Sequence, residues 1–164
     1  MNVKTKQLLD GFIARPNSSL LLIGTKTQGI EQCIDYVKNG LLHGDNRNNF
    51  LTFGDSSDKN TSVEDVRSFK NSIMTRVGGK DKVARIAYIQ GIQHASKEAQ
   101  NALLKVLEEP VEKTIIILQA DDRHGVLTTI TSRCQIVPVL PLSESQALEM
   151  AKSMGRSEAE AKKA

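Results

Sequence analysis

Residues 99–110 read Ala-Gln-Asn-Ala-Leu-Leu-Lys-Val-Leu-Glu-Glu-Pro, and no other stretch indicates the architecture so directly. Ser96 can cap a helix that begins just before this stretch, and Pro110 ends the helix because proline has no amide to donate. The apolar side chains recur at spacings of three and four, which places them on one helix face: Ala99, Ala102, Leu103, Val106 and Leu107. We therefore predict an amphipathic helix packed against a larger apolar surface.

Five short apolar runs can supply that surface: residues 19–24, 50–53, 86–89, 114–118 and 135–140. The runs lack strict polar alternation, which is typical of parallel strands covered on both faces. A second helical segment follows Ser62, which forms a capping-box pattern with Asp65, and its apolar face comprises Val63, Val66, Phe69 and Ile73. Strands that alternate with helices on this scale predict a three-layer α/β domain with right-handed crossovers.

Length and composition limit the classes of protein to consider. A chain of 164 residues can bury one ordinary core, and a net charge of +3 does not select a partner. The sequence has no long apolar run and no signal-peptide pattern, so we expect a cytoplasmic protein. The cysteines and histidines lack metal-ligand spacing, so we expect reduced thiols, no metal and no cofactor: Cys33, Cys134, His43, His94 and His124.

A second motif, Thr131-Ser132-Arg133-Cys134, follows the predicted helix. Together with residues 99–110 it resembles the ATPase core of the clamp-loader subunits of DNA replication. This AAA+ group includes the bacterial delta-prime and gamma/tau subunits and the small subunits of replication factor C. The resemblance covers about residues 1–155 and implies a parallel-sheet, P-loop NTPase-like core.

In that family the core is followed by a helical lid and then by a helical collar that joins the subunits in a ring. We assign residues 1–141 to the core and residues 142–164 to the first part of the lid. Ser143 and Gln146 can start a lid helix, Gly155 can stop it, and Ser157 can cap another. The collar is then missing, which suggests either a truncated chain or a naturally reduced protein, and we expect it to be monomeric in isolation.

The phosphate loop of an active member needs Gly-x-x-x-x-Gly-Lys-Ser/Thr, whose lysine and hydroxyl contact phosphate and magnesium. Here Gly24 and Gly29 preserve the frame after the first strand, but Ile30 replaces the lysine and Glu31 replaces the hydroxyl residue. An isoleucine cannot neutralise phosphate, and Glu31 repels it. Lys26 lies in the variable part of the loop, where we interpret it as a solvated residue. The loop is therefore predicted to be vestigial.

The remaining groups of an ATPase centre are also replaced. By the family's spacing, the acids that hold magnesium and polarise water fall on Gln90 and Gly91, so this acidic site is vestigial too. The γ-phosphate sensor falls on Ala120 and Asp121. Asp121 and Asp122 could hold a cation, but adjacent acids at a strand end are typical of a solvated turn.

Arg133 of the Ser132–Cys134 motif is retained. In the family this arginine enters the ATP site of the neighbouring subunit and stabilises the transferring phosphoryl group. The resemblance thus implies a catalytic role in trans for Arg133, with Ser132 and Cys134 as the rest of the motif. The other interpretation is an arginine that caps the preceding helical turn or pairs with a surface acid. Cys134 is expected in the core.

The pattern is most similar to delta-prime subunits, which lack a working ATPase site, although the four-cysteine zinc module common in the family is absent between the first helix and the second strand. We expect a non-hydrolysing scaffold that partners gamma/tau and delta subunits in loading the sliding clamp on DNA. Weak contact with primed-DNA phosphates is conceivable through six cations: Arg67, Lys70, Arg76, Lys80, Lys82 and Arg85. The alternatives are a divergent gamma-like ATPase that uses Lys26 with Asp121 or Asp122, and an AAA+ interaction module outside replication.

Overall fold

The computed structural model describes residues 1–16, 19–54 and 61–153, and its centre is a sheet of five parallel strands in the order β2-β3-β4-β1-β5. The strands are β1 (Ser19–Ile23), β2 (Phe50–Phe53), β3 (Arg85–Ile89), β4 (Thr114–Ala120) and β5 (Cys134–Pro138). Each coincides with one of the predicted apolar runs to within two residues. The predicted α/β fold with a parallel sheet is therefore confirmed.

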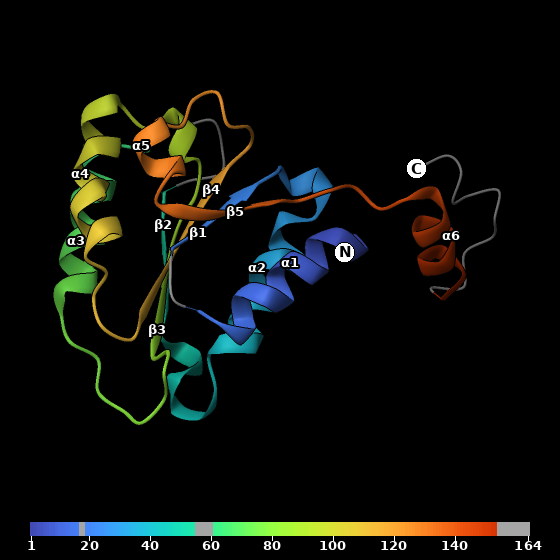
Figure 1. Ribbon diagram of the computed structural model, residues 1–164, viewed down its shortest axis with the longest axis horizontal. Helices are drawn as coiled ribbons and strands as arrows, with labels where there is room; N and C mark the ends of the chain where they lie inside the picture. The colour runs from blue at the N-terminus through green and yellow to red at the C-terminus, as the bar shows by residue number, and fades with distance from the viewer. Residues whose placement is uncertain (17–18, 55–60, 154–164) are drawn as a thin grey trace.

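The helices are α1 (Val3–Ala14), α2 (Ile30–Leu41), α3 (Val63–Met74), α4 (Lys97–Glu108), α5 (Thr128–Thr131) and α6 (Glu144–Ser153), with short 3-10 turns η1 (Lys26–Gln28), η2 (Gly44–Asn48) and η3 (Ile92–His94). Helices α1 and α2 cover one face of the sheet, and α3 and α4 cover the other (Figure 1). Strand β1 shows why both faces are apolar. Leu20 and Leu22 pack in the α1–α2 core, whereas Leu21 packs in the α3–α4 core.

The predicted helix caps form. The Ser62 side chain accepts from the amide of Asp65 at 3.0 Å, and the Asp65 carboxylate accepts from the amide of Ser62 at 2.8 Å. The Ser96 side chain caps α4 by accepting from the amide of Ala99 at 3.1 Å. The predicted helix after Ser143 is α6, which lies away from the sheet at the end of the segment that follows β5 (Figure 1). Gly155 and Ser157, the predicted stop and second cap, lie outside the described residues.

Arg85 is a buried structural residue, which corrects its interpretation as a surface cation. Only 6% of the residue is exposed. Its Nη1 donates to the carbonyl of Ser72 at 3.0 Å, and its Nη2 donates to the carbonyls of Ile73 and Thr75 at 2.6 and 2.9 Å. Both Nε and Nη2 lie within hydrogen-bond distance of Thr114 Oγ1. Arg85 therefore joins the end of α3 to the start of β4.

The cysteines differ in burial. Cys33 is 1% exposed and lies in the α1–α2 core, whereas Cys134 is partly buried against the α3–α4 core. Burial raises the pKa of the Cys134 thiol to about 12.

Among the described residues, no group of three or more His, Cys, Asp or Glu side chains could hold a metal ion. Within the same ranges, none of the helices combines the length and apolar character needed to cross a membrane.

Candidate functional site

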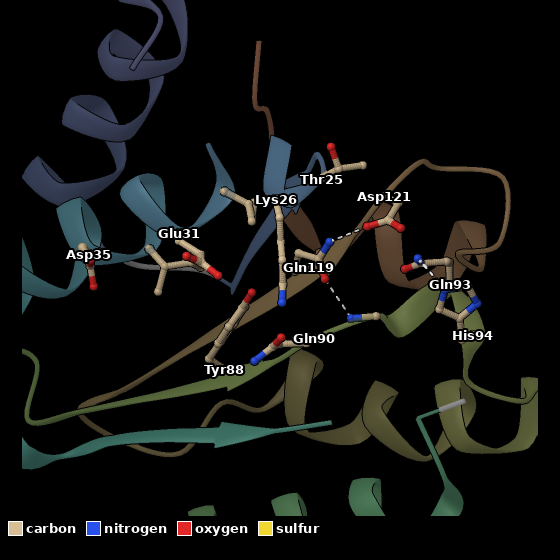
Figure 2. Close-up of a pocket in the computed structure, with 13 residues that line it drawn as sticks. Thr25, Lys26, Glu31, Asp35, Tyr88, Gln90, Gln93, His94, Gln119 and Asp121 are labelled. Carbon is tan, nitrogen blue, oxygen red and sulfur yellow. Dashed lines mark hydrogen bonds between the residues drawn. The ribbon is translucent and has the colours of Figure 1, made fainter. Parts of the chain in front are cut away.

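The positions that correspond to an ATPase centre meet at the carboxyl edge of the sheet. Parallel neighbours β1, β3 and β4 end there, so their following residues lie side by side. They surround a cavity of about 350 Å³ whose lining includes Lys26, Glu31, Tyr88, Gln90, Gln119 and Asp121 (Figure 2). The structure thus brings together Ile30, Glu31, Gln90 and Gly91, which the sequence analysis assigned to one site, although the groups differ from those of an ATPase.

The phosphate loop forms hydrogen bonds to itself. The Thr25 amide donates to Gln28 Oε1 at 2.9 Å, and the Gln28 amide donates back to the carbonyl of Thr25 at 3.1 Å. The amides of Gly29 and Ile30 also donate within the loop, to the carbonyls of Lys26 and Thr25. A phosphate loop binds its ligand with amides that point into the cradle. In this loop the amides of Thr25, Gln28 and Gly29 already donate to loop oxygens, and the amide of Ile30 makes a longer contact of 3.4 Å.

Ile30 and Glu31 have opposite environments. Ile30, at the position of the phosphate lysine, is 4% exposed and packs in the α1–α2 core. Glu31 is exposed at the cavity, and Asp35 follows it one turn later on α2 (Figure 2). Burial and the negative charges of Glu31 and Asp121 raise the pKa of Tyr88. The cavity wall thus carries carboxylates where a nucleotide triphosphate would need cations.

Lys26 is exposed, as predicted for a loop residue, but its side chain points into the cavity toward Tyr88 (Figure 2).

The two aspartates, Asp121 and Asp122, have different surroundings. Asp121 lines the cavity and accepts from Gln119 Nε2 at 2.9 Å. Asp122 does not line the cavity, and it accepts from the amide of His124 at 2.7 Å. Of the alternative ATPase groups, only Lys26 and Asp121 are therefore brought together.

Gln119 links three strand ends and was not identified from the sequence. Its Nε2 donates to the carbonyl of Gly24 at 2.9 Å, and its Oε1 accepts from the amide of Gly91 at 2.8 Å. Together with the bond to Asp121, which is dashed in Figure 2, these contacts join the ends of β1, β3 and β4. The available signal was a glutamine within the otherwise apolar run of β4. Such a buried amide needs partners from other segments.

We expect Gln119→Leu to lower the free energy of unfolding by about 2 kcal/mol, because the buried amide of Gly91 and carbonyl of Gly24 would lose their partner. Urea unfolding of the chain measures this loss. Gln7→Leu, at an exposed position of α1, is the matched control and should change stability by less than about 0.5 kcal/mol. Equal stability of the two variants would show that Gln119 does not hold this edge together.

Arg133 lies at the opposite end of the strands from the cavity, at the amino edge where the strands begin. It directly precedes β5, whose first residue, Cys134, pairs with Ser19 at the start of β1. The cavity adjoins the far end of β1, roughly 16 Å away for a strand of five residues at about 3.3 Å per residue. Arg133 therefore cannot act on a ligand in the cavity of its own chain.

Contacts within the chain hold the Arg133 guanidinium. Nε donates to Glu108 Oε1 at 2.9 Å, and Nη2 forms a second bond to the same oxygen. Nη1 donates to the carbonyl of Thr129 at 2.7 Å. Both contacts that the other interpretation anticipated, a helical turn and a surface acid, are thus present. The Arg133 side chain is 32% exposed, so part of it is accessible to another molecule.

Comparisons with known proteins identify the family. The family described as DNA polymerase III, delta subunit, matches residues 21–143. The chain belongs to this family. DNA polymerase III subunit delta′ of Haemophilus influenzae is 36% identical over 58% of the chain and 28% of that protein. The delta′ subunit of Buchnera aphidicola is 32% identical over 76% of the chain and 38% of that protein.

The chain of this DNA polymerase III family member spans less than two fifths of the length of these two relatives. A gamma subunit-related protein of Thermotoga maritima shares the fold with a TM-score of 0.68 and 21% identity, over 98% of this chain and 56% of that one. The RuvB branch-migration motor of the same organism has a TM-score of 0.61 and 13% identity, over 93% and 49% of the two chains. The predicted resemblance to clamp-loader subunits with an AAA+ core is confirmed.

Proposed function

We propose that the chain is the core of a non-hydrolysing clamp-loader subunit that acts as a scaffold and supplies Arg133 to the ATP site of a neighbouring subunit. The observation that carries the proposal is the separation of Arg133 from the degenerate cavity. Arg133 lies at the amino edge of the sheet, whereas the degenerate cavity lies at the carboxyl edge. A guanidinium in this position can assist phosphoryl transfer only in the ATP site of a neighbouring subunit.

The chemistry of the cavity supports a lack of hydrolysis. The phosphate lysine is replaced by the buried Ile30, and the loop amides donate to carbonyl and amide oxygens of the loop. Gln90 and Gly91 offer no carboxylate to hold magnesium or to polarise water. Nucleotide binding would therefore have to break loop hydrogen bonds and overcome the charges of Glu31 and Asp121.

We expect no ATP turnover and no ATP affinity tighter than about millimolar, the range left to a few backbone contacts. Isothermal titration calorimetry with Mg-ATP measures the affinity, with a gamma/tau subunit as the positive control. Ile30→Lys should not restore hydrolysis, because the magnesium and water-activating groups would still be absent. Magnesium-dependent binding in the micromolar range would contradict the proposal.

One observation favours the gamma-like alternative. Lys26 points into the cavity that Asp121 also lines, so a cation and a carboxylate are both available there (Figure 2). In that alternative, Lys26→Ala would abolish any ATP binding that calorimetry detects. In the proposed function, Lys26→Ala changes nothing in the titration, because any residual binding depends on backbone contacts and not on Lys26.

The partners in this proposal are gamma/tau and delta subunits, and the activity is loading of the sliding clamp on DNA. Helix α6 would begin the lid, in keeping with a core of residues 1–141.

Direct contact with DNA phosphates is limited by the structure around the six cations of residues 67–85. Arg85 is buried and Arg67 pairs with Glu64 at 3.0 Å. The remaining candidates for such contact are the half-buried Lys70 and the exposed Arg76, Lys80 and Lys82.

A further inference from the structure

The guanidinium of Arg133 is held by two structural elements that meet at the amino edge of the sheet. Glu108, the last residue of α4, accepts from Nε and Nη2 through a single oxygen. The carbonyl of Thr129 in α5 accepts from Nη1. Arginine has several rotatable bonds and would otherwise sample many directions. The two contacts therefore restrict the direction in which this side chain points.

We propose that Glu108 is a positioning residue that orients Arg133 for its action on the neighbouring subunit. The inference rests on the proposed function, in which Arg133 acts in trans. An arginine that arrives already oriented loses less side-chain entropy when it meets a phosphoryl group, and its geometry is set before the reaction begins. Glu108 itself does not need to contact the nucleotide.

The donor count of Arg133 is compatible with this role. Of the five N–H donors of a guanidinium, the bonds to Glu108 and Thr129 use three. Ser132 Oγ lies 3.5 Å from Nη1, beyond the ordinary length of a hydrogen bond. Among contacts of ordinary length in the described part of the chain, two N–H groups thus remain available. Two is the number that a bidentate contact with a phosphoryl group requires.

Stability alone gives little reason for an acid at position 108. A carboxylate at the carboxyl end of a helix is disfavoured by the helix dipole, and Glu108 is the last residue of α4. The Glu108 side chain is 49% exposed, and ion pairs at such exposure add little to stability. The main effect of the Glu108–Arg133 pair is therefore to orient Arg133, and not to stabilise the fold.

The test is a double-mutant cycle in the full-length protein, assembled with its clamp-loader partners and assayed for DNA-stimulated ATP hydrolysis. Glu108→Ala should lower kcat by about threefold to tenfold, an intermediate loss for a misplaced catalytic group, and leave KM for ATP unchanged because the partner binds the nucleotide. Glu108→Gln keeps an acceptor oxygen and should retain more turnover than Glu108→Ala. In the Arg133→Ala background, Glu108→Ala should change kcat by less than about twofold.

The matched control is Glu109→Ala. Glu109 carries the same charge at the next position and takes part in none of the ion pairs found within residues 1–16, 19–54 and 61–153. Its substitution should leave kcat unchanged, and native assembly of each variant is checked by gel filtration and thermal melting.

Two results would overturn the inference while the proposed function stands. In both, Arg133→Ala lowers turnover. In one, Glu108→Ala leaves kcat unchanged or raises it, which would mean that Glu108 does not help Arg133 to act. In the other, Glu108→Ala lowers kcat equally with and without Arg133, which would mean that it acts elsewhere. If Arg133→Ala itself leaves turnover intact, the proposed function fails first.

Discussion

Arg85→Leu is expected to lower the free energy of unfolding of the chain by about 3 kcal/mol, the cost of leaving several partly buried acceptors without a donor. Among the described residues, the substitution would remove the only side chain that donates hydrogen bonds to the carbonyls of Ser72, Ile73 and Thr75. These carbonyls lie at the carboxyl end of α3, where the helix itself supplies no donors. Urea unfolding followed by circular dichroism measures the loss.

Two variants define the origin of this effect. Arg85→Lys keeps the charge but lacks the planar fork that reaches three carbonyls, so it should recover less than half of the loss. Lys82→Leu removes an exposed cation close by in the chain and should change stability by less than about 0.5 kcal/mol. If Arg85→Leu is as stable as the parent protein but binds DNA more weakly, Arg85 acts as a surface cation and its assignment as a structural residue is wrong.

The sheet could be predicted because its strands are buried on both faces. In β3 and β4 every residue is buried, so each appears in the sequence as a nearly continuous apolar run. Arg85 shows the limit of that reasoning. It opens β3, but a charge count cannot tell a cation that faces solvent from one whose guanidinium is enclosed by helix carbonyls. That distinction depends on where α3 ends in space.

Helix α1 was not predicted, although its pattern is visible in retrospect. Thr5, Leu9 and Phe12 are its buried residues, spaced four and three apart. The stripe is narrow, and one of its members is polar. Thr5 is buried because its hydroxyl donates to the carbonyl of Pro138 and accepts from the amide of Leu140. Contacts across more than 130 positions cannot be inferred from local periodicity.

The candidate site was located by its spacing from a motif, but its internal contacts were not. The pattern Thr25-x-x-Gln28 could have suggested a capping box that closes the phosphate loop, because both partners lie within one turn. By contrast, Gln119 reaches Gly24 across 95 positions. The pairing of Arg133 with Glu108 likewise depends on how α4 and α5 meet. Only the assembled fold brings these groups together.

The second large effect is expected for Arg133. In a loader reconstituted with the full-length protein, Arg133→Ala should lower DNA-stimulated ATP hydrolysis by about tenfold or more at the site it faces, the low end of the range for arginine fingers. The charge that Arg133 offsets develops only during phosphoryl transfer, so kcat should fall more than the affinity for ATP. Arg133→Lys should not restore the rate, because lysine lacks the planar fork.

Some loss of stability is also expected, since Arg133 bonds to Glu108 and Thr129 of its own chain. For a partly exposed ion pair this amounts to about 1 kcal/mol at most, or roughly 2–4 °C in the melting temperature of a domain of this size. Arg133→Lys serves as the control, because it keeps the charge next to Glu108 while removing the fork. A fall in turnover well beyond this small destabilisation therefore cannot result from unfolding.

The most direct measurement is single-turnover ATP hydrolysis at the one site that Arg133 faces, with the other ATP sites of the loader inactivated through their own phosphate-loop lysines. The account predicts that Arg133→Ala slows this turnover by about tenfold or more while the variant still assembles with its partners. Unchanged turnover in the assembled variant would contradict it, whatever the change in melting temperature. Arg133 would then be a structural residue that joins α4 to α5.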